Sequence, residues 1–429
     1  MTRTIVVEHL ARIEGHAGIT VEIDGDHIDQ VRFDVFEGLR LFEGLVRGRP
    51  VVEVAGIVSR ICAICSHGHA ITALQALERA MGIEVSAQTE RLRELAFHGA
   101  AIESHALHVF CLALPDLLRH ASVIELAGVA PETVAMALRL KKLGNTIQEV
   151  VGGRAVHPVN YAIGGFGKLP AGSELARLRD ALAAGLDDCE RAVTAVDGLD
   201  VPAFAAESIR CAALVPRGES WFFGDAIHLS DGRTIPVEAY RTLTNERAIP
   251  HSTAKHSLES GQPYMVGALP RLTLNGGRIT GRARDVWAHL GPTVPCRNVI
   301  MNDLAQLVEL VFSVQEALRI VEEMQEAGLT PEPRRRYEAR AGRGAAAAEV
   351  PRGILFHSYE IDAGGLIAAA DVITPTAQNC AHVEEQFRAA VRRQPDAPDE
   401  ELRHRLEIIA RAYDPCVSCS VHVIRTGRT

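Results

Sequence analysis

Two Cys-x-x-Cys pairs stand at opposite ends of this chain, and they restrict its fold more than any other feature. The first pair, Cys62 and Cys65, lies in RICAICSHGH (60–69). The second, Cys416 and Cys419, lies in DPCVSCSVH (414–422), near the end of the 429-residue chain. A metal site built from two such pairs needs all of its thiols at one point. The sequence therefore predicts a fold that brings its two ends together.

The composition indicates a large hydrophobic core and reduced thiols. Hydrophobic residues make up 47% of the chain, and its nine cysteines are an odd number spread along it, unlike the even, dense set of a small secreted protein. We find no signal-peptide pattern and no apolar run of roughly 18 residues. The net charge of -9 argues against nucleic-acid binding. We predict a soluble, cytoplasmic protein with no nucleic-acid partner and no membrane insertion.

The hydrophobic pattern predicts an α+β fold that is mainly helical, with a large helical bundle as its core. Alternation of apolar and polar residues indicates a small sheet or hairpin over 3–36. Small β regions are also expected around 200–300 and in a hairpin over 354–375 that turns at Gly364 and Gly365. Apolar residues at helical spacing predict helices over 71–83, 89–114, 131–151, 173–193 and 304–329.

We expect a single large domain, 1–429, made of consecutive regions. The predicted regions are an N-terminal β region (3–36), a helical bundle (60–200), a mixed β and irregular region (201–300), a long helix (301–329), a flexible connection rich in Pro, Arg, Gly and Ala (330–353), and a hairpin with the C-terminal cysteine segment (354–429).

Both cysteine pairs are predicted to lie at helix N-termini. If a helix begins at RICAIC, then Cys62, Cys65 and His69 share one face, where the helix dipole favours thiolates. At the other end, Asp414 is a good N-cap and Pro415 a good first residue for a helix that carries the second pair. Four thiolates suit an iron–sulfur cluster or a soft transition metal, and the spacing alone fits a closed zinc site equally well.

The surroundings of the two pairs favour a working metal centre over an inert zinc site. Each pair is followed by a histidine, His69 or His422, and each is flanked by charge, at Arg60 or Asp414. A closed zinc site needs none of these groups, and redox CxxC motifs fit less well because neither pair adjoins a βαβ pattern. Further candidate carboxylates, each in apolar or glycine-rich surroundings, are Glu14, Glu43 and Asp116.

Several motifs together resemble the large, catalytic subunit of [NiFe]-hydrogenases. They are RIEGH (12–16), RICAIC with His69, SHALHVFCLALPD (104–116), GGRAVHP (152–158), PRG (351–353), the Thr-Pro motif near 375 and DPCVSCSVH. The match spans nearly the whole chain, and its ending looks most like the soluble hydrogenases that exchange electrons with NAD(P). The resemblance implies one catalytic domain that cleaves H2 reversibly and heterolytically into protons and electrons.

The resemblance implies a nickel–iron centre on the four cysteines. Cys62 and Cys416 match the terminal nickel ligands, and Cys65 and Cys419 match the ligands that bridge to an iron carrying CO and two cyanides, Fe(CN)2(CO). Thiolates are soft donors and suit nickel. Cys416 is the expected first proton acceptor, and Glu14 matches the glutamate that passes the proton outward.

Other motif residues match groups that surround this centre. Arg352 matches the arginine over the open metal position, and Asp116 and Asp414 match the carboxylates that hold it there. Thr376 matches the residue whose hydroxyl bonds a cyanide. His69 matches a histidine that hydrogen bonds to a bridging thiolate and tunes its basicity.

The resemblance also implies a separate ion and several partners. Glu43, His422 and a backbone carbonyl near Val372 match the ligands of an ion that is usually magnesium, although another divalent ion would suit the imidazole better. No Fe–S ligand set remains in the chain, so an Fe–S small subunit is implied, with flavin- and NAD(P)-binding diaphorase subunits beyond it. Two alternatives stay open: an H2-sensing regulatory subunit and a zinc-stabilised structural or binding protein.

Overall fold

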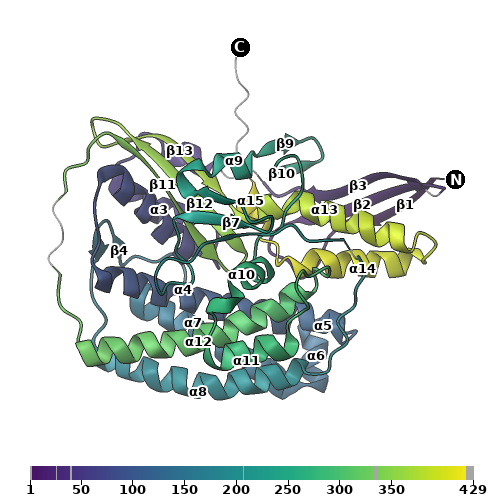
Figure 1. Ribbon diagram of the computed structural model, residues 1–429, viewed down its shortest axis with the longest axis horizontal. Coiled ribbons are helices and arrows are strands. Elements are labelled where there is room, and N and C mark those ends of the chain that lie inside the picture. The colour runs from purple at the N-terminus through teal and green to yellow at the C-terminus, as the bar shows by residue number, and fades with distance from the viewer. Residues whose placement is uncertain (1, 26, 39–40, 206, 333–336, 422–429) are drawn as a thin grey trace, which may run out of the picture.

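Long helices form one side of the molecule, and small antiparallel sheets with several further helices form the other (Figure 1). The computed structural model describes residues 2–25, 27–38, 41–205, 207–332 and 337–421. The predicted α+β, mainly helical fold class is confirmed. Within these ranges no helix is both long enough and apolar enough to cross a membrane.

The helical side is a bundle whose members were predicted from their apolar spacing. The run over 89–114 continues past its first helix as a π-helical turn and one more short helix, because the backbone stays helical through to Leu117. The long bundle helices are α4 (Ala87–Leu107), α7 (Pro131–Gly152), α8 (Gly172–Val196) and α12 (Met301–Ala327).

The remaining helices are mostly short and surround the sheets or flank the bundle. They are α1 (Phe42–Val46), α2 (Val51–Val58), α3 (Ser66–Met81), η1 (His108–Ala113), α5 (Leu114–Leu117), α6 (Val123–Val129), η2 (Val237–Ala239), α9 (Arg241–Thr244), α10 (Ala268–Asn275), η3 (Gly276–Arg278), α11 (Gly281–Leu290), α13 (Pro375–Arg393), α14 (Asp399–Ala412) and α15 (Val417–Ser420).

The sheets of the described ranges are all antiparallel and small. Three of them have three strands in sequential order, and two are strand pairs. Their strands are β1 (Thr2–Val7), β2 (Ala17–Asp24) and β3 (His27–Val35); β4 (Tyr161–Ala162) and β5 (Gly165–Phe166); β6 (Ala212–Leu214), β7 (Ala226–Leu229) and β8 (Thr234–Pro236); β9 (Arg247–Ile249) and β10 (Ser252–His256); and β11 (Gly342–Val350), β12 (Gly353–Ile361) and β13 (Ile367–Ile373).

Two predicted regions need correction. The flexible connection over 330–353 contains β11, which pairs along its whole length with β12; residues 333–336 lie outside the described ranges. The small residues there allow close packing on α3: a Cβ at Gly344 would lie 2.2 Å from the carbonyl oxygen of Ala76. The region 201–300, predicted as β and irregular, also contains the helices α10 and α11.

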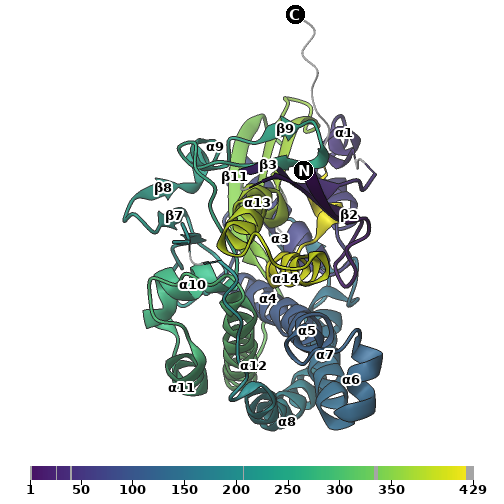
Figure 2. The same ribbon diagram turned by 90° about the vertical axis from the view of Figure 1, so that its right-hand side faces the viewer.

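The N-terminal strands and the helices α13 and α14 near the C-terminus lie side by side, as the cysteine pairs predicted. In Figures 1 and 2 the purple N-terminal strands run beside the yellow helices α13 and α14, and β3 contacts α13 while β1 contacts α14. The side chain of Arg3 pairs with Asp399, with Nε 2.5 Å from Oδ1. Farther along, Glu14 forms a parallel β-bridge with Cys416. This arrangement places the RIEGH motif directly against the second cysteine pair.

Candidate metal centre

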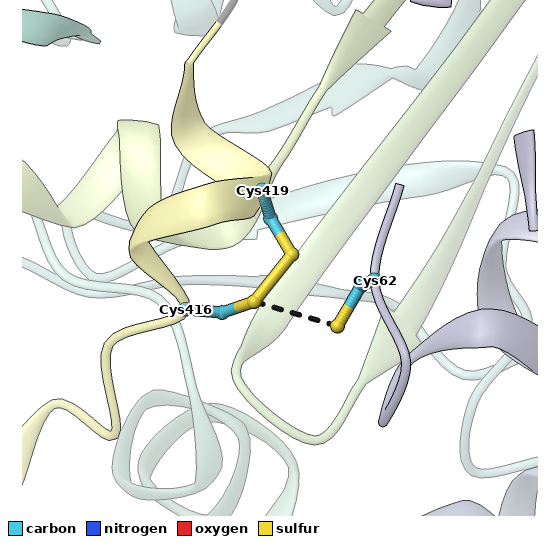
Figure 3. Close-up of side chains that lie close together, drawn as sticks. All are labelled: Cys62, Cys416 and Cys419. Atoms are coloured by element: carbon cyan, nitrogen blue, oxygen red, sulfur yellow. Dashed lines mark hydrogen bonds between the residues drawn. A yellow bond between two sulfur atoms is a disulfide. The ribbon is translucent and has the colours of Figure 1, made fainter. Parts of the chain in front are cut away.

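The two cysteine pairs converge at one buried point. The sulfur atoms of Cys62, Cys416 and Cys419 all lie within 4.8 Å of one another, and Cys62 Sγ is 3.4 Å from Cys416 Sγ. Figure 3 shows the second pair reaching from the C-terminal segment toward Cys62, with Cys416 and Cys419 joined by a disulfide. Cys65 completes the set, and its backbone N–H donates to Cys62 Sγ at 3.2 Å. All four side chains are buried.

Both pairs lie at helix N-termini as predicted, but α3 begins after Cys62, so Cys62 does not share a helix face with Cys65 and His69. Helix α3 begins at Ser66, so Cys62 lies in the turn before it and Cys65 is its N-cap. Helix α15 is a single turn whose N-cap is Cys416. Asp414 does not cap it, because its carboxylate pairs with an arginine and its backbone has a φ of 49°. The left-handed region is one that aspartate tolerates better than most residues.

Arg352 lies over the first cysteine pair and is only 4% exposed. Its Nη2 donates to Asp414 Oδ1 at 2.9 Å, its Nε to the Asp414 carbonyl oxygen at 2.6 Å, and its Nη1 to Cys65 Sγ at 3.4 Å. Burial lowers the pKa of Arg352, but the charges of Asp414 and the cysteines outweigh burial and raise it overall. The predicted pairing of Arg352 with Asp414 is therefore present, and a fixed positive charge faces the sulfurs.

The thiols of the first pair differ in acidity. The hydrogen bond that it shares with Cys62 lowers the pKa of Cys65, and the Arg352 guanidinium lowers it further, although burial opposes both. The same hydrogen bond and burial raise the pKa of Cys62. Of the two thiols, Cys65 is therefore the one that ionises more readily. A second positive charge would be needed to hold both as thiolates.

Asp116 does not pair with Arg352 in the described residues, which corrects the predicted pairing. It binds Arg411, whose Nε lies 2.5 Å from Oδ2 and whose Nη2 lies 3.1 Å from Oδ1, and it also pairs with Arg12. The carbonyl oxygen of Arg411 in turn accepts the Asp414 N–H at 2.7 Å. Asp116 therefore supports the turn that carries Asp414, one step away from Arg352.

Glu14 is half-buried and lies against the second cysteine pair. Its Oε2 is 3.2 Å from Cys416 Sγ and accepts the Ser418 N–H at 3.1 Å, while Oε1 accepts the Ser418 hydroxyl. Its backbone carbonyl accepts the Val417 N–H at 2.9 Å. The next residue, Gly15, has a φ of +89°, and a Cβ there would lie 3.0 Å from Ser418 N. Only glycine fits this close, left-handed turn.

Thr376 and His69 both lie close to the four cysteines. The Thr376 hydroxyl oxygen accepts the Cys416 N–H at 3.0 Å, so it fixes the backbone of that cysteine. His69 Nδ1 lies 3.1 Å from His357 Nε2, and His357 Nδ1 lies 2.7 Å from the Tyr359 hydroxyl. This buried row of side chains joins α3 to β12.

Two of the three residues predicted to hold a separate ion are in contact. Glu43 Oε1 accepts the Val372 N–H at 2.8 Å, and burial raises the pKa of Glu43. His422 lies outside the described residues. A cavity of about 430 Å³ adjoins Glu43 and is lined also by Glu246 and Lys255, whose charged groups pair at 2.7 Å.

Sequence reasoning missed several supporting side chains. Arg12 and Ser418 stand inside the recognised motifs and were detectable there. The others were not, because nothing local in the sequence reveals which buried polar groups meet across the fold. They are Arg411, Gln306 and His357.

The donor set fits a soft transition metal. Four buried sulfurs from two distant segments meet beneath the Arg352 guanidinium. The Glu14 carboxylate contacts one of them, that of Cys416. Thiolates prefer zinc, copper(I), iron–sulfur or nickel-type centres over hard ions. Any such centre requires Cys416 and Cys419 in the reduced, thiolate form.

Comparison with known proteins identifies the family. A family model described as "Nickel-dependent hydrogenase" matches residues 40–136 and 293–422, and one described as "HoxL-like" matches residues 4–37. The chain is 36% identical to sulfhydrogenase 1 subunit alpha of Pyrococcus furiosus, with 98% of both chains covered. It is 34% identical to sulfhydrogenase 2 subunit alpha of the same organism, with 98% of this chain and 99% of that one covered.

Solved structures agree in fold. An NAD+-reducing [NiFe]-hydrogenase in the H2-reduced state superposes with a TM-score of 0.87 at 26% identity, over 98% of this chain and 99% of that chain. A Ni-Fe-Se hydrogenase of D. vulgaris Hildenborough has a TM-score of 0.78 at 19% identity, over 98% of this chain and 100% of that chain, and it supports the fold alone. The chain therefore belongs to the nickel-dependent hydrogenase family, as a large subunit of the [NiFe] type.

Proposed function

We propose that this chain is the hydrogen-activating subunit of a hydrogenase and that Cys62, Cys65, Cys416 and Cys419 hold its nickel–iron centre. The observation that carries the proposal is the meeting of four buried sulfurs, Arg352 and Glu14 at one point. When bound, a nickel–iron centre carrying CO and cyanides supplies the redox-active position at which H2 is split into two protons and two electrons. The chain's own residues then determine where the protons go.

The Cys416 thiolate is the proposed first proton acceptor. Its sulfur lies 3.2 Å from Glu14 Oε2, a distance across which a thiol donates directly to a carboxylate. Ser418 fixes Glu14 through its N–H and its hydroxyl, so the carboxylate keeps one orientation toward the sulfur. Glu14 is half-buried, with the exposed His16 two residues on. A proton that reaches Glu14 is therefore already near solvent.

Arg352 is proposed to orient H2 and the diatomic ligands through its fixed charge. Its guanidinium donates to Asp414 on one side and to the Cys65 sulfur on the other. A guanidinium stays protonated at every working pH, so this charge does not vary as protons leave. We propose that Thr376, whose hydroxyl lies beside Cys416, hydrogen bonds a cyanide. We also propose that His69, on α3, supports a bridging thiolate.

Substitution of Glu14 tests the proposed proton route. In Glu14→Gln, exchange between D2 and water and H2-driven dye reduction should fall by at least about 100-fold, because a positioned proton-transfer group contributes roughly that much. Nickel and iron content should stay unchanged, since Glu14 is not one of the proposed ligands. The matched control is Glu8→Gln, an exposed carboxylate on the same N-terminal segment, which should keep full activity. Full isotope exchange in Glu14→Gln would remove Glu14 from the route.

The electron partners are proposed from the relatives. One structural neighbour is an NAD+-reducing [NiFe]-hydrogenase, and the relatives include sulfhydrogenases and hydrogenases named F420-non-reducing. We propose an Fe–S small subunit as the first electron acceptor and flavin- and NAD(P)-binding subunits after it, with H2 as substrate in the cytoplasm. Reduction of NAD+ or NADP+ by H2 in the purified complex is the expected result. A complex that reduces only artificial dyes would contradict this proposed linkage.

The ion near Glu43 is a separate proposal. Glu43, His422 and the Val372 carbonyl would hold magnesium or another divalent ion behind the C-terminal segment. Its support is the contact between Glu43 and Val372 and the burial that raises the pKa of Glu43, a cost that a nearby cation would offset.

A further inference from the structure

Three potential metal-binding side chains lie together on a face formed by β10, α13 and β3. His251 directly precedes β10, His256 ends it, and Glu384 stands in the middle of α13. His251 Nε2 is 2.8 Å from Glu384 Oε1, and His256 Nδ1 is 3.8 Å from Glu384 Oε2. One ligand atom from each of the three lies within 4.8 Å of the others. None of these residues takes part in the cysteine site.

His256 is buried with an incomplete set of partners. It is 5% exposed, its Nε2 has no hydrogen-bond partner within the described chain, and its Nδ1 is too far from Glu384 for a hydrogen bond. The nitrogen nearer Glu384 is Nδ1, so Nδ1 is the atom that would bind an ion beside that carboxylate. Burial, with a smaller contribution from His251, lowers the pKa of His256 to about 4. At neutral pH it is therefore an uncharged imidazole, the form that binds metals.

Glu384 is held in place by groups that leave one oxygen available. Its Oε1 accepts the Phe33 N–H from β3 at 2.8 Å as well as the contact from His251. Burial raises the pKa of Glu384, although the bonds from Phe33 and His251 lower it in part. Hydrogen bonds to a ligating carboxylate of this kind fix its orientation toward a metal. Oε2, on the His256 side, accepts no hydrogen bond from the part of the chain that the structure describes.

The distances match an ion placed between the side chains. Bonds of about 2.0–2.2 Å to nitrogen and oxygen span ligand separations of up to about 4 Å, which includes the 3.8 Å between His256 and Glu384. A cavity of about 500 Å³ opens beside them, lined by both of these residues and by Arg247, Glu385 and Arg388. An ion can therefore enter from solvent, and water can occupy a fourth position.

We propose that His251, His256 and Glu384 form a binding site for a zinc-type divalent transition ion, separate from the cysteine centre. Two imidazoles and one carboxylate are a common donor set for Zn2+ and also suit Co2+ and Ni2+, whereas Mg2+ prefers oxygen ligands and water. An ion here joins β10 to α13 and, through Glu384, to β3. Because Ala254 of β10 also bridges to Val421, the ion braces the face on which the C-terminal segment rests.

The test uses the intact, matured hydrogenase complex, in which the cysteines are already occupied. After removal of loosely bound metal with a chelator, the complex is titrated with Co2+ and followed by the visible absorption of the ion. With excess Mg2+ present to fill the separate ion site proposed near Glu43, the expected result is one Co2+ per large subunit, displaced by Zn2+, with nickel and iron content unchanged. His256→Gln and Glu384→Gln should each weaken Co2+ binding at least tenfold, since even groups behind a metal ligand contribute about that much.

A matched control and a second variant keep the outcome clear. His289 pairs with Asp197 at 2.8 Å on the exposed surface, and among the described residues no third ligand group joins them, so His289→Gln should leave the titration unchanged. If His256→Gln does not fold, the partly exposed His251→Gln replaces it. Absence of saturable Co2+ binding to the wild-type complex overturns the proposal. Unchanged affinity in both His251→Gln and Glu384→Gln overturns it as well.

Discussion

Two buried arginines, Arg352 and Arg271, lie close in the fold and have opposite kinds of surroundings. Arg271 donates to both oxygens of Glu309, at 2.6 and 2.5 Å, to Glu349 at 2.9 Å, and to the carbonyl oxygens of Val350 and Pro351. All of its donors are used within the protein. Arg352, the very next residue after Pro351, binds Asp414 on one side and turns its Nη1 toward the sulfur of a cysteine.

The two arginines therefore have different roles: Arg271 stabilises the fold, whereas Arg352 serves the chemistry of the site. Burial raises the pKa of Glu309, but Arg271 outweighs it and lowers that pKa to about 2, so this cluster is a charged, satisfied brace between α10, α12 and β11. At Arg352, three of the five N–H donors bond to Asp414 and Cys65 within the described residues, so donors remain for a group that the chain itself does not supply. The brace also holds the segment that carries Arg352, because Arg271 binds the two carbonyls that precede it. The fully hydrogen-bonded cluster around Arg271 thus holds Arg352 in position beside the cysteines.

Removal of the brace should have the largest effect on stability. Arg271→Met leaves Glu309 and Glu349 buried without their cation, which should cost about 3–5 kcal/mol of unfolding free energy. Denaturant unfolding of the purified complex measures the loss. The control is Arg282→Met, which breaks a surface pair with Glu190 and should cost less than about 1 kcal/mol. Equal losses in the two variants would contradict the role given to the brace.

Substitution of the second arginine should affect turnover instead. Arg352→Lys keeps the charge but cannot reach Asp414 and Cys65 together with a single ammonium group. Hydrogen oxidation should fall by roughly 10²–10³-fold, as it does when one positioned donor is removed. Nickel and iron content and the melting temperature should stay close to wild type. Near-normal rates would leave Arg352 with a structural role like that of Arg271.

A third buried carboxylate, Asp303, should make stability depend on pH. Burial raises its pKa to about 7, the opposite direction from Glu309 on the same helix. The unfolded chain ionises Asp303 above its ordinary pKa of 3.8 while the folded chain keeps it protonated, so stability falls as pH rises toward 7. Between pH 5 and 8 this residue should cost roughly 2–3 kcal/mol.

Unfolding experiments at both pH values test this sign. Asp303→Asn should remove that part of the pH dependence and gain stability relative to wild type at pH 8 more than at pH 5. The exposed Asp285→Asn on α11 is the control and should not change the profile. A greater relative gain at pH 5 would show that the sign is wrong.

The smallest predicted effect is at Ser86, at the start of a helix that carries neither arginine. Ser86 caps helix α4, and its Oγ accepts the Thr89 N–H at 3.0 Å. Ser86→Ala should lower stability by about 1 kcal/mol without changing turnover. Thermal unfolding combined with an activity assay checks both parts. A change in turnover here would mean that loss of stability alone reduces activity, and it would weaken the contrast between Arg271 and Arg352.

The sequence predicted the parts of this molecule that have local signals. Apolar spacing located the bundle helices, and the cysteine motifs with RIEGH located the sulfurs and Glu14. The β11 strand was missed because alanine and glycine are typical of flexible connections and also of strands packed tightly on a helix. The partner of Asp116 was wrong because Arg411 and Arg352 both lie near Asp414, and only the fold decides which carboxylate each one meets.

Metal analysis with an infrared spectrum of the matured complex tests the central claim most directly. Nickel and iron should be present together, with CO and cyanide stretching bands, and both metals should be lost in Cys62→Ser. The measurement is best repeated in His256→Gln, so that no ion at the proposed histidine site adds to the count. Zinc without nickel and without those bands, retained in that variant, would make the four cysteines a structural clip and contradict the account.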